Sequence, residues 1–296
     1  MVESPSRWGG PPGPRPAPRP ALPRPNETDS SNQERDEGVP RGPGGPPHGL
    51  GFVRRLLVRQ AKKLFPRTLK HRIKLACGVP DTDACLAAMK RRGFDPKVAV
   101  EVGAYCGEWT IAFRHLFPET RVLMVEPQQS QGDRLRALTH IHNGVEFAPV
   151  LLGAAAVTGV PFYQAETGSS VLRDPGNSSA RLTEMPMTTL DIVTRASDFE
   201  RADFLKLDVQ GYELEVLKGA GHLLQSVEAV LMEVNLIAVY QAAPLVHEAV
   251  AYMAAHGFHV YDVCTFFRRP YDNALWQMDT MFVRATSPLL ASTRWA

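Results

Sequence analysis

The stretch at residues 98–107, VAVEVGAYCG, decides the fold of this chain. A short apolar run rich in valine ends in Glu101 and opens into a turn that contains Gly103 and Gly107. A segment with helical spacing follows over residues 108–117. Strand, glycine turn and helix in this order bring the backbone of a parallel sheet close to a nucleotide-like ligand. The sequence therefore predicts an α/β protein with a ligand site at this turn.

The acidic residues around the turn indicate which ligand it binds. A second apolar run, residues 122–125, ends in Glu126, and a carboxylate about twenty residues beyond the turn can hold ribose hydroxyls. Glu101 precedes the first glycine, and an acid there would repel a pyrophosphate. A ligand with a cationic end and an adenosine, such as S-adenosylmethionine, fits better. The alternative is an ordinary strand-to-helix turn that binds nothing.

Strands and helices alternate after residue 97, which is typical of a mostly parallel sheet. Asp81 is expected to cap a first helix at residues 81–92, and Gly93 to end it. The region 154–184 shows no periodicity and is expected to be a long, functional loop. The predicted strands are 98–102, 121–125, 145–152, 204–208, 229–234, 259–264 and 278–284, and the other predicted helices are 108–117, 128–139, 191–196, 211–225 and 245–256.

Five segments carry a family resemblance. VEVGAYCGEWTIAF (100–113), VLMVEP (122–127), TGSSVL (167–172), FLKLDVQGYELEVLKGA (204–220) and MDTMFVR (278–284) together resemble the FkbM-type methyltransferase family. The resemblance covers about residues 98–284. It implies a Rossmann-like, seven-stranded class I methyltransferase sheet, mostly parallel with an antiparallel last strand and helices on both faces.

The same resemblance implies a function. The expected reaction is methyl transfer from S-adenosylmethionine to an oxygen of a sugar or small natural product. The chain departs from the family pattern at Gln210, where an acid is common, and at Tyr212, where a small residue is common. Tyr105 and Cys106 replace an Asn and a variable residue in the turn. These departures bear on the acceptor pocket more than on the cofactor.

Methyl transfer to a hydroxyl requires alignment of the acceptor and a base that removes its proton. Asp208 ends a predicted strand, where open α/β sheets bind ligands, and Glu213 begins the following helix. One of the two is expected to be the catalytic base, and Asp208 can instead contact the methionine amino group. Glu233, at the end of the next strand, can share a proton with Asp208, bind substrate hydroxyls or hold a divalent ion with Asp279. We expect no metal.

The residues expected to contact the cofactor share one place, the glycine turn and the ends of the neighbouring strands. Tyr105 and Trp109 can offer a ring to the sulfonium cation. Lys206 is expected to pair with Asp208 or Glu233. The predicted cofactor-binding residues are Glu101, Gly103, Ala104, Tyr105, Gly107, Glu126, Pro127, Ser170 and Asp208.

Composition sets the domain boundaries. Residues 1–49 are rich in Pro, Gly and Arg, and are expected to be a disordered tail because they lack core-forming side chains. Residues 50–96 are expected to be a basic helical extension, 97–286 the methyltransferase domain and 287–296 a C-terminal tail. The segment 52–75 is amphipathic and basic, so it either packs on the domain or contacts a membrane surface peripherally.

Charge and cysteine content narrow the class of protein. The net charge is +2, with 33 basic and 31 acidic residues, and no nucleic-acid partner is expected. Four scattered cysteines indicate free thiols in a reducing cytosol, so we expect a cytoplasmic protein. The family resemblance implies a small-molecule or glycan acceptor. Three alternatives remain open: a silent binding or membrane-docking module, an NAD-dependent oxidoreductase, which the missing G-x-G-x-x-G disfavours, and a methyltransferase acting on nitrogen or protein.

Overall fold

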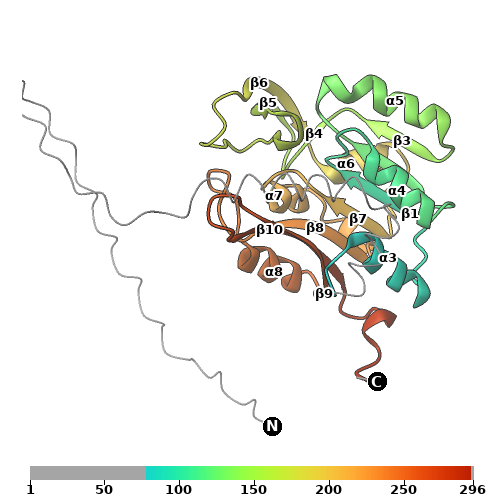
Figure 1. Ribbon diagram of the computed structural model, residues 1–296. Helices are drawn as coiled ribbons and strands as arrows, with labels where there is room; N and C mark the ends of the chain where they lie inside the picture. Colours follow the sequence, from blue (N-terminus) through green and yellow to red (C-terminus); the bar gives the residue numbers. More distant parts are fainter. Residues whose placement is uncertain (1–77, 295–296) are drawn as a thin grey trace, which may run out of the picture. The chain divides into compact units, whose positions relative to one another are not determined.

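The computed structural model describes residues 78–294, and their centre is a seven-stranded sheet (Figure 1). Its strand order is β3-β2-β1-β7-β8-β10-β9. All neighbours pair in parallel except β10, which runs antiparallel to β8 and β9. This confirms the predicted fold class. The strands are β1 Val98–Val102, β2 Arg121–Val125, β3 Val145–Ala148, β7 Phe204–Leu207, β8 Ala229–Asn235, β9 Phe258–Arg268 and β10 Leu275–Arg284.

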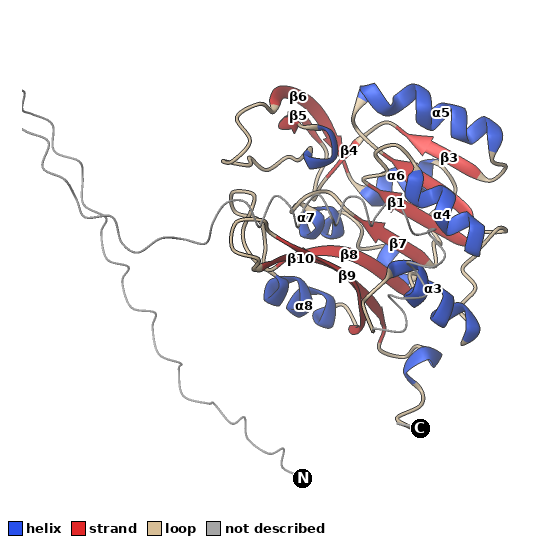
Figure 2. Ribbon diagram, viewed as in Figure 1, coloured by secondary structure: helices blue, strands red, loops and turns tan. Residues whose placement is uncertain are grey.

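Helices cover both faces of the sheet, because side chains alternate across each strand (Figure 2). Val100 and Val102 pack with one set of helices, α6 Leu190–Ala196, α7 Glu213–Lys218 and α8 Val246–Ala255. Ala99 packs with the other set, α3 Thr82–Arg91, α4 Glu108–Leu116 and α5 Gly132–Ile141. Glu101 is two residues from Ala99, so its side chain lies on the face that α4 covers.

The N-terminal boundary of the described fold follows the predicted capping. Asp81 accepts a hydrogen bond from the backbone N–H of Ala84 at 3.2 Å, which makes it the N-cap of α3. At the other end the fold continues past the expected boundary at residue 286. A short 3₁₀ helix, η4 Pro288–Leu290, buries Leu289, and Arg92 donates a hydrogen bond to the Leu289 carbonyl. The 1–49 tail and the 52–75 segment lie outside the described residues.

The expectation of a loop over residues 154–184 is wrong at both ends of this region, whereas residues 169–180 contain no named helix or strand. The ends belong to a second, three-stranded sheet of order β4-β6-β5, with β4 Leu151–Leu152, β5 Val157–Gln164 and β6 Arg181–Thr188. The two long strands are half-exposed, and Phe162 is the fully buried residue of β5. Because so few of their side chains are buried, the sequence shows no hydrophobic alternation there. A short 3₁₀ helix, η2 Glu166–Gly168, follows β5.

Three other predicted elements are divided or shifted. The strand expected at 145–152 ends as β3 before Pro149 and resumes as β4 in the other sheet, because proline cannot donate to a ladder. The helix expected at 211–225 is instead α7 and a 3₁₀ helix, η3 Leu223–Gln225, separated at the poor helix formers Gly219 and Gly221. The helix expected at 128–139 begins as a 3₁₀ turn, η1 Gln129–Gln131, before α5.

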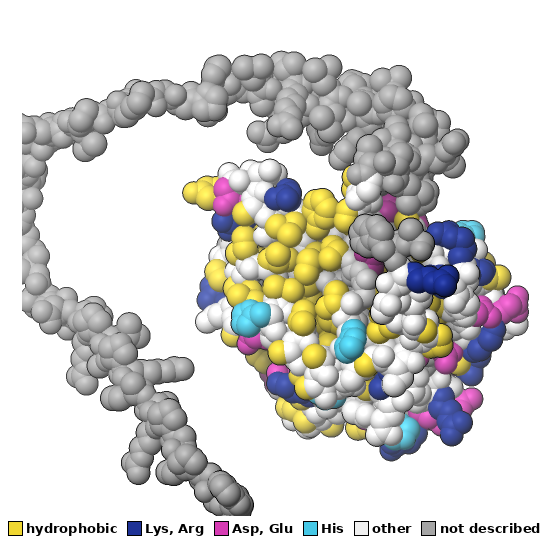
Figure 3. Space-filling model, turned by 90° about the horizontal axis from the view of Figure 1, so that it is seen from below, with side chains coloured by type: hydrophobic (Ala, Val, Ile, Leu, Met, Phe, Trp, Pro, Cys, Tyr) yellow, Lys and Arg dark blue, Asp and Glu magenta, His cyan; other side chains and the backbone are white. Residues whose placement is uncertain are grey.

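Hydrophobic side chains gather on the face of the molecule seen in Figure 3. The outermost strand of the large sheet, β9, carries three large exposed apolar side chains, Val260, Phe266 and Phe267.

No helix within residues 78–294 combines the length and apolar character needed to cross a bilayer.

Candidate functional site

A cavity of about 270 Å³ opens where β1, β2, β7 and β8 end. This is the edge at which open parallel sheets bind ligands. Strand β4 and the segment that follows β5 also line the cavity, so the small sheet closes the site. Residues that line the cavity include Glu101, Gly103, Ala104, Tyr105, Trp109, Glu126, Pro127, Gln128, Leu151, Phe162, Ser170, Lys206, Asp208, Gln210 and Glu233.

The glycine turn is fixed to both neighbouring strands. The N–H groups of Gly103 and Ala104 donate to the Val125 carbonyl at 2.9 and 3.1 Å, which ties the turn to β2. Gly103 has φ +80°, and a Cβ at this position would lie 1.9 Å from the carbonyl oxygen of Asp208. Only glycine permits both this backbone conformation and this approach to β7. The turn therefore brings β1, β2 and β7 together at the mouth of the cavity.

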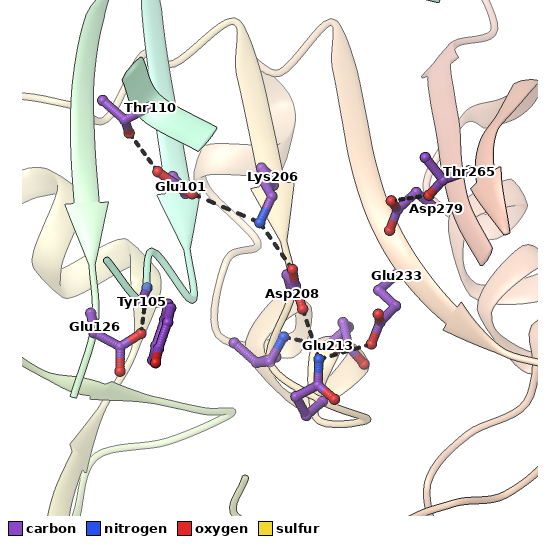
Figure 4. Close-up of polar contacts among 12 residues, drawn as sticks. Glu101, Tyr105, Thr110, Glu126, Lys206, Asp208, Glu213, Glu233, Thr265 and Asp279 are labelled. Carbon is purple, nitrogen blue, oxygen red and sulfur yellow. Dashed lines mark hydrogen bonds and ion pairs between the residues drawn. The ribbon is translucent and has the colours of Figure 1, made fainter. Parts of the chain in front are cut away.

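Glu126 is positioned to accept hydrogen bonds from the hydroxyl groups of a ligand. One carboxylate oxygen accepts the Tyr105 N–H at 2.8 Å and the other accepts the Gln128 N–H at 3.0 Å. Burial raises the pKa of Glu126, although these backbone donors oppose the shift. Each oxygen retains a lone pair for a ligand donor in the cavity. The two backbone N–H groups thus fix the orientation of the Glu126 carboxylate, which lines the cavity (Figure 4).

Lys206 joins two carboxylates on the face of the sheet covered by α4 (Figure 4). Its Nζ lies 3.2 Å from Asp208 Oδ2 and 3.8 Å from Glu101 Oε1, and 5.7 Å from the centre of the Trp109 ring. Burial disfavours the charged amine, but the two carboxylates outweigh it, so the pKa of Lys206 is raised. The predicted pairing with Asp208 is present.

Glu101 is almost wholly buried and accepts a hydrogen bond from the Thr110 hydroxyl. Burial raises the pKa of Glu101 to about 7, although Lys206 and Thr110 both favour the ionised form.

Glu213 and Gly107 lie outside the lining of the cavity. One oxygen of Glu213 accepts the N–H groups of Val209 and Gly211 at 3.0 and 3.1 Å, which holds the turn between β7 and α7. A Cβ at Gly107 would lie 2.3 Å from the side chain of Leu138, so this glycine lets α5 pack closely. The two residues position other parts of the site, and their direct roles stay predictions.

Gln210 connects the ends of β7 and β8. Its amide nitrogen donates to Asp208 Oδ1 at 3.0 Å and to Glu233 Oε1 at 3.1 Å, while its amide oxygen accepts the Tyr240 hydroxyl at 2.8 Å. The residue has φ +57°, and its carbonyl accepts the hydroxyl of Ser170 at 2.9 Å. Gln210, which departs from the family pattern, therefore forms hydrogen bonds through both its side chain and its backbone carbonyl within the site.

The cavity brings together eight of the nine residues predicted to bind the cofactor, with Gly107 as the exception. Phe162 was not predicted, because it lies on a strand that was expected to be a loop. Gln128 was also missed, although it follows the Glu126-Pro127 pair by one position. Tyr240 was missed because it lies outside every predicted element, and Gln277 was missed because it lies one residue before the predicted strand 278–284. Within residues 78–294 no group of three or more acidic, His or Cys side chains has a metal-binding arrangement.

Several known proteins are similar to this chain. "Methyltransferase 1" from Beauveria bassiana (strain ARSEF 2860) is 27% identical over 146 residues, which are 42% of this chain and 59% of that protein. The match therefore spans less than two thirds of that relative. The crystal structure of precorrin-6y C5,15-methyltransferase from Geobacter metallireducens GS-15 aligns with a TM-score of 0.38 and 11% identity, over 68% of this chain and 86% of that chain.

The N-terminal domain of EvdMO1, solved with SAH bound, aligns with a TM-score of 0.41 and 12% identity, over 69% of this chain and 81% of that chain. The family assignment depends on neither of these structures but on a match to a family profile. The profile described as "Methyltransferase FkbM domain" matches residues 101–260, which is more than half of the chain and includes every strand end that forms the cavity. The chain therefore belongs to the FkbM methyltransferase domain family.

Proposed function

We propose that this protein transfers a methyl group from S-adenosylmethionine to a hydroxyl of a sugar or another small, hydroxyl-rich acceptor. The observation that carries the proposal is Glu126, a buried carboxylate oriented by two backbone N–H groups beside the glycine turn. Family membership supports the methyl transfer, and the sugar-like acceptor comes from the resemblance of the motifs. A cytoplasmic location, peripheral membrane contact through 52–75 and activity without a metal accompany the proposal as predictions.

The residues present fit this methyl donor. Glu126 suits the ribose hydroxyls, and the apolar side chains of Val125, Leu151 and Phe162 offer a wall for a flat adenine ring. Asp208 supplies negative charge for the cationic end of the ligand, and Glu101 lines the same cavity. When bound, S-adenosylmethionine supplies an electrophilic methyl group. The chain's own task is then to hold the acceptor oxygen in line and to take its proton.

A methyltransferase acting on nitrogen remains the second candidate. The same cavity would serve it, but a neutral amine is already a good nucleophile and requires no base at the moment of attack. A hydroxyl is a weak nucleophile and requires a base in the transition state. The carboxylates at the ends of β7 and β8 favour the hydroxyl.

Substitution of Glu126 tests the cofactor site. Glu126→Ala should weaken S-adenosylmethionine binding by about 1–3 kcal/mol, because two charge-assisted hydrogen bonds are lost. Isothermal calorimetry on the full chain measures the effect, with Glu119→Ala, an exposed glutamate between α4 and β2, as the matched control. Equal affinity in the wild type and Glu126→Ala would remove Glu126 from the site, and no binding by the wild type would refute the function itself.

The acceptor requires a separate experiment. Cell extract is incubated with the protein and with S-adenosylmethionine labelled in its methyl group, and mass spectrometry identifies the molecules that gain the label. A labelled hydroxyl compound is the expected result. Label on protein or on nitrogen alone would contradict the proposed acceptor class.

A further inference from the structure

We propose that Glu233, at the end of β8, is the general base that takes the proton from the acceptor hydroxyl. This assignment rests on the proposed function and replaces Asp208 and Glu213, the two acids that the sequence suggests for this step. It also places the acceptor on the β8 and β10 side of the cavity, with the cofactor on the β1 and β2 side.

Glu233 lies at the correct edge of the sheet. It is one residue from the Val234 position that packs among α6, α7 and α8, so its side chain is on the opposite face, the face of Glu101 and Lys206. Its side chain lines the cavity and the residue is 8% exposed. The carboxylate therefore faces the cavity rather than bulk water.

The two oxygens of Glu233 are in different environments (Figure 4). Oε1 accepts the side-chain amides of Gln210 at 3.1 Å and Gln277 at 2.8 Å. The described residues form no hydrogen bond to Oε2; both bonds to this carboxylate go to Oε1. A carboxylate held by one oxygen, with the other oxygen not bonded by residues 78–294, is positioned to accept a proton from a bound ligand.

Three nearby carboxylates, those of Asp208, Glu213 and Glu101, are already engaged by other groups. Asp208 is bonded through both oxygens, to the Lys206 ammonium at 3.2 Å and to the Gln210 amide at 3.0 Å. An ion pair and an amide hydrogen bond therefore occupy both oxygens of Asp208. Glu213 binds two backbone N–H groups and does not line the cavity. Glu101 is enclosed between Thr110 and Lys206.

The charges around Glu233 also favour its role as a proton acceptor. Burial raises the pKa of Glu233 well above its ordinary value, and the carboxylates of Asp208, Glu213 and Asp279 raise it further. Lys206 is the opposing cation, and it lies nearer to Asp208 and Glu101, with which it forms ion pairs. A base is most effective when its pKa lies near the working pH, which an ordinary exposed glutamate does not achieve.

The methyl and the proton move in one balanced step. The acceptor oxygen forms a bond to the methyl carbon while the bond from that carbon to sulfur breaks, sulfur keeps the electron pair, and the hydroxyl proton passes to Glu233 Oε2. Glu233 then returns the proton to water. The Gln210 and Gln277 amides keep Oε1 fixed while Oε2 changes its protonation.

The test compares Glu233→Gln with Asp208→Asn and with Glu119→Gln, the exposed control. Transfer of ¹⁴C-methyl from labelled S-adenosylmethionine to the acceptor fraction of cell extract is measured against pH, and calorimetry measures binding of unlabelled S-adenosylmethionine. Glu233→Gln should lower the transfer rate by about 10²- to 10⁴-fold and abolish the acidic limb of the pH profile. Its affinity for S-adenosylmethionine should change by less than about threefold. Asp208→Asn should keep the acidic limb, and Glu119→Gln should match the wild type.

A second measurement does not depend on activity. NMR of the full chain with ¹³C-labelled glutamate carboxyl groups follows each titration, and the signal missing from Glu233→Gln identifies Glu233. A Glu233 pKa at or below the ordinary value would overturn the assignment, as would a transfer rate in Glu233→Gln within fivefold of the wild type. Wild-type protein that binds S-adenosylmethionine but transfers no methyl to any acceptor would instead overturn the proposed function and the assignment with it.

Discussion

Replacement of Gly103 by alanine tests the close approach on which the whole site depends. The added Cβ would lie 1.9 Å from the Asp208 carbonyl oxygen, about 1.5 Å closer than an ordinary contact. The oxygen belongs to the backbone beside β7, so no side-chain rotation relieves the overlap. Either the glycine turn moves away from β7 or the end of β7 moves away from the turn.

The expected loss of stability has two parts. A left-handed backbone costs about 1–2 kcal/mol for alanine, since its Cβ crowds the following carbonyl. Overpacking against a fixed neighbour adds about 1–3 kcal/mol. The free energy of unfolding of Gly103→Ala should therefore fall by about 2–5 kcal/mol, which for a domain of this size lowers Tm by about 4–20 °C.

Two other glycines separate these parts. Gly93 has φ +94°, and a Cβ added there would have no neighbouring atom within 4 Å, so Gly93→Ala measures the backbone cost alone. Gly221 has neither a positive φ nor a close neighbour, so Gly221→Ala should be neutral or stabilising by about 0.4–1 kcal/mol. Urea denaturation followed by circular dichroism gives all three values. A loss in Gly103→Ala no larger than that in Gly93→Ala would refute the close approach to Asp208.

Two further predictions concern the polar groups. The pKa of Glu101 is raised to about 7 in the fold, so the unfolded chain loses this proton first and stability falls as pH rises from about 4.5 to 7. Glu101→Gln should remove that fall: it should raise the free energy of unfolding by up to about 3 kcal/mol at pH 8 and leave it nearly unchanged at pH 4. Urea denaturation at both pH values measures the effect. An equal effect at the two pH values would contradict the raised pKa. Tyr240→Phe removes the hydroxyl that orients the Gln210 amide and should lower the free energy of unfolding by about 1 kcal/mol in the same assay, whereas Tyr271→Phe, at a residue 90% exposed, should have no effect. A similar loss in both tyrosine variants would show that the Gln210 contact is not responsible.

The linear motifs determined the large sheet and the acidic side chains at the ends of its strands. The central parallel strands β1, β2, β7 and β8 appear in the sequence as short, mostly apolar runs, because both of their faces are buried. Such runs can be recognised without any tertiary information. Glu101, Glu126 and Asp208 lie at the ends of these runs. Because the carboxyl ends of parallel strands share one edge of the sheet, their convergence on a single cavity was predictable.

Long-range packing determined what the sequence could not. Strands β5 and β6 bury few side chains, so neither shows a period, and Phe162 entered the cavity unpredicted. Residue type alone did not distinguish Glu213, which binds backbone N–H groups, from Glu233, which faces the cavity. The difference arises from partners more than twenty residues away, Gln210 and Gln277 for Glu233.

The sequence by itself thus determined that acidic side chains and a glycine turn meet at one edge of a parallel sheet, because local hydrophobic runs and turns encode strand ends. Only the tertiary structure determined which acidic side chains are bonded to other groups and which one remains available to a ligand. Lys206 forms ion pairs with Glu101 and Asp208, and the amides of Gln210 and Gln277 hold one oxygen of Glu233. These contacts join strands that are distant in the chain, so the sequence alone does not show which carboxylate remains available.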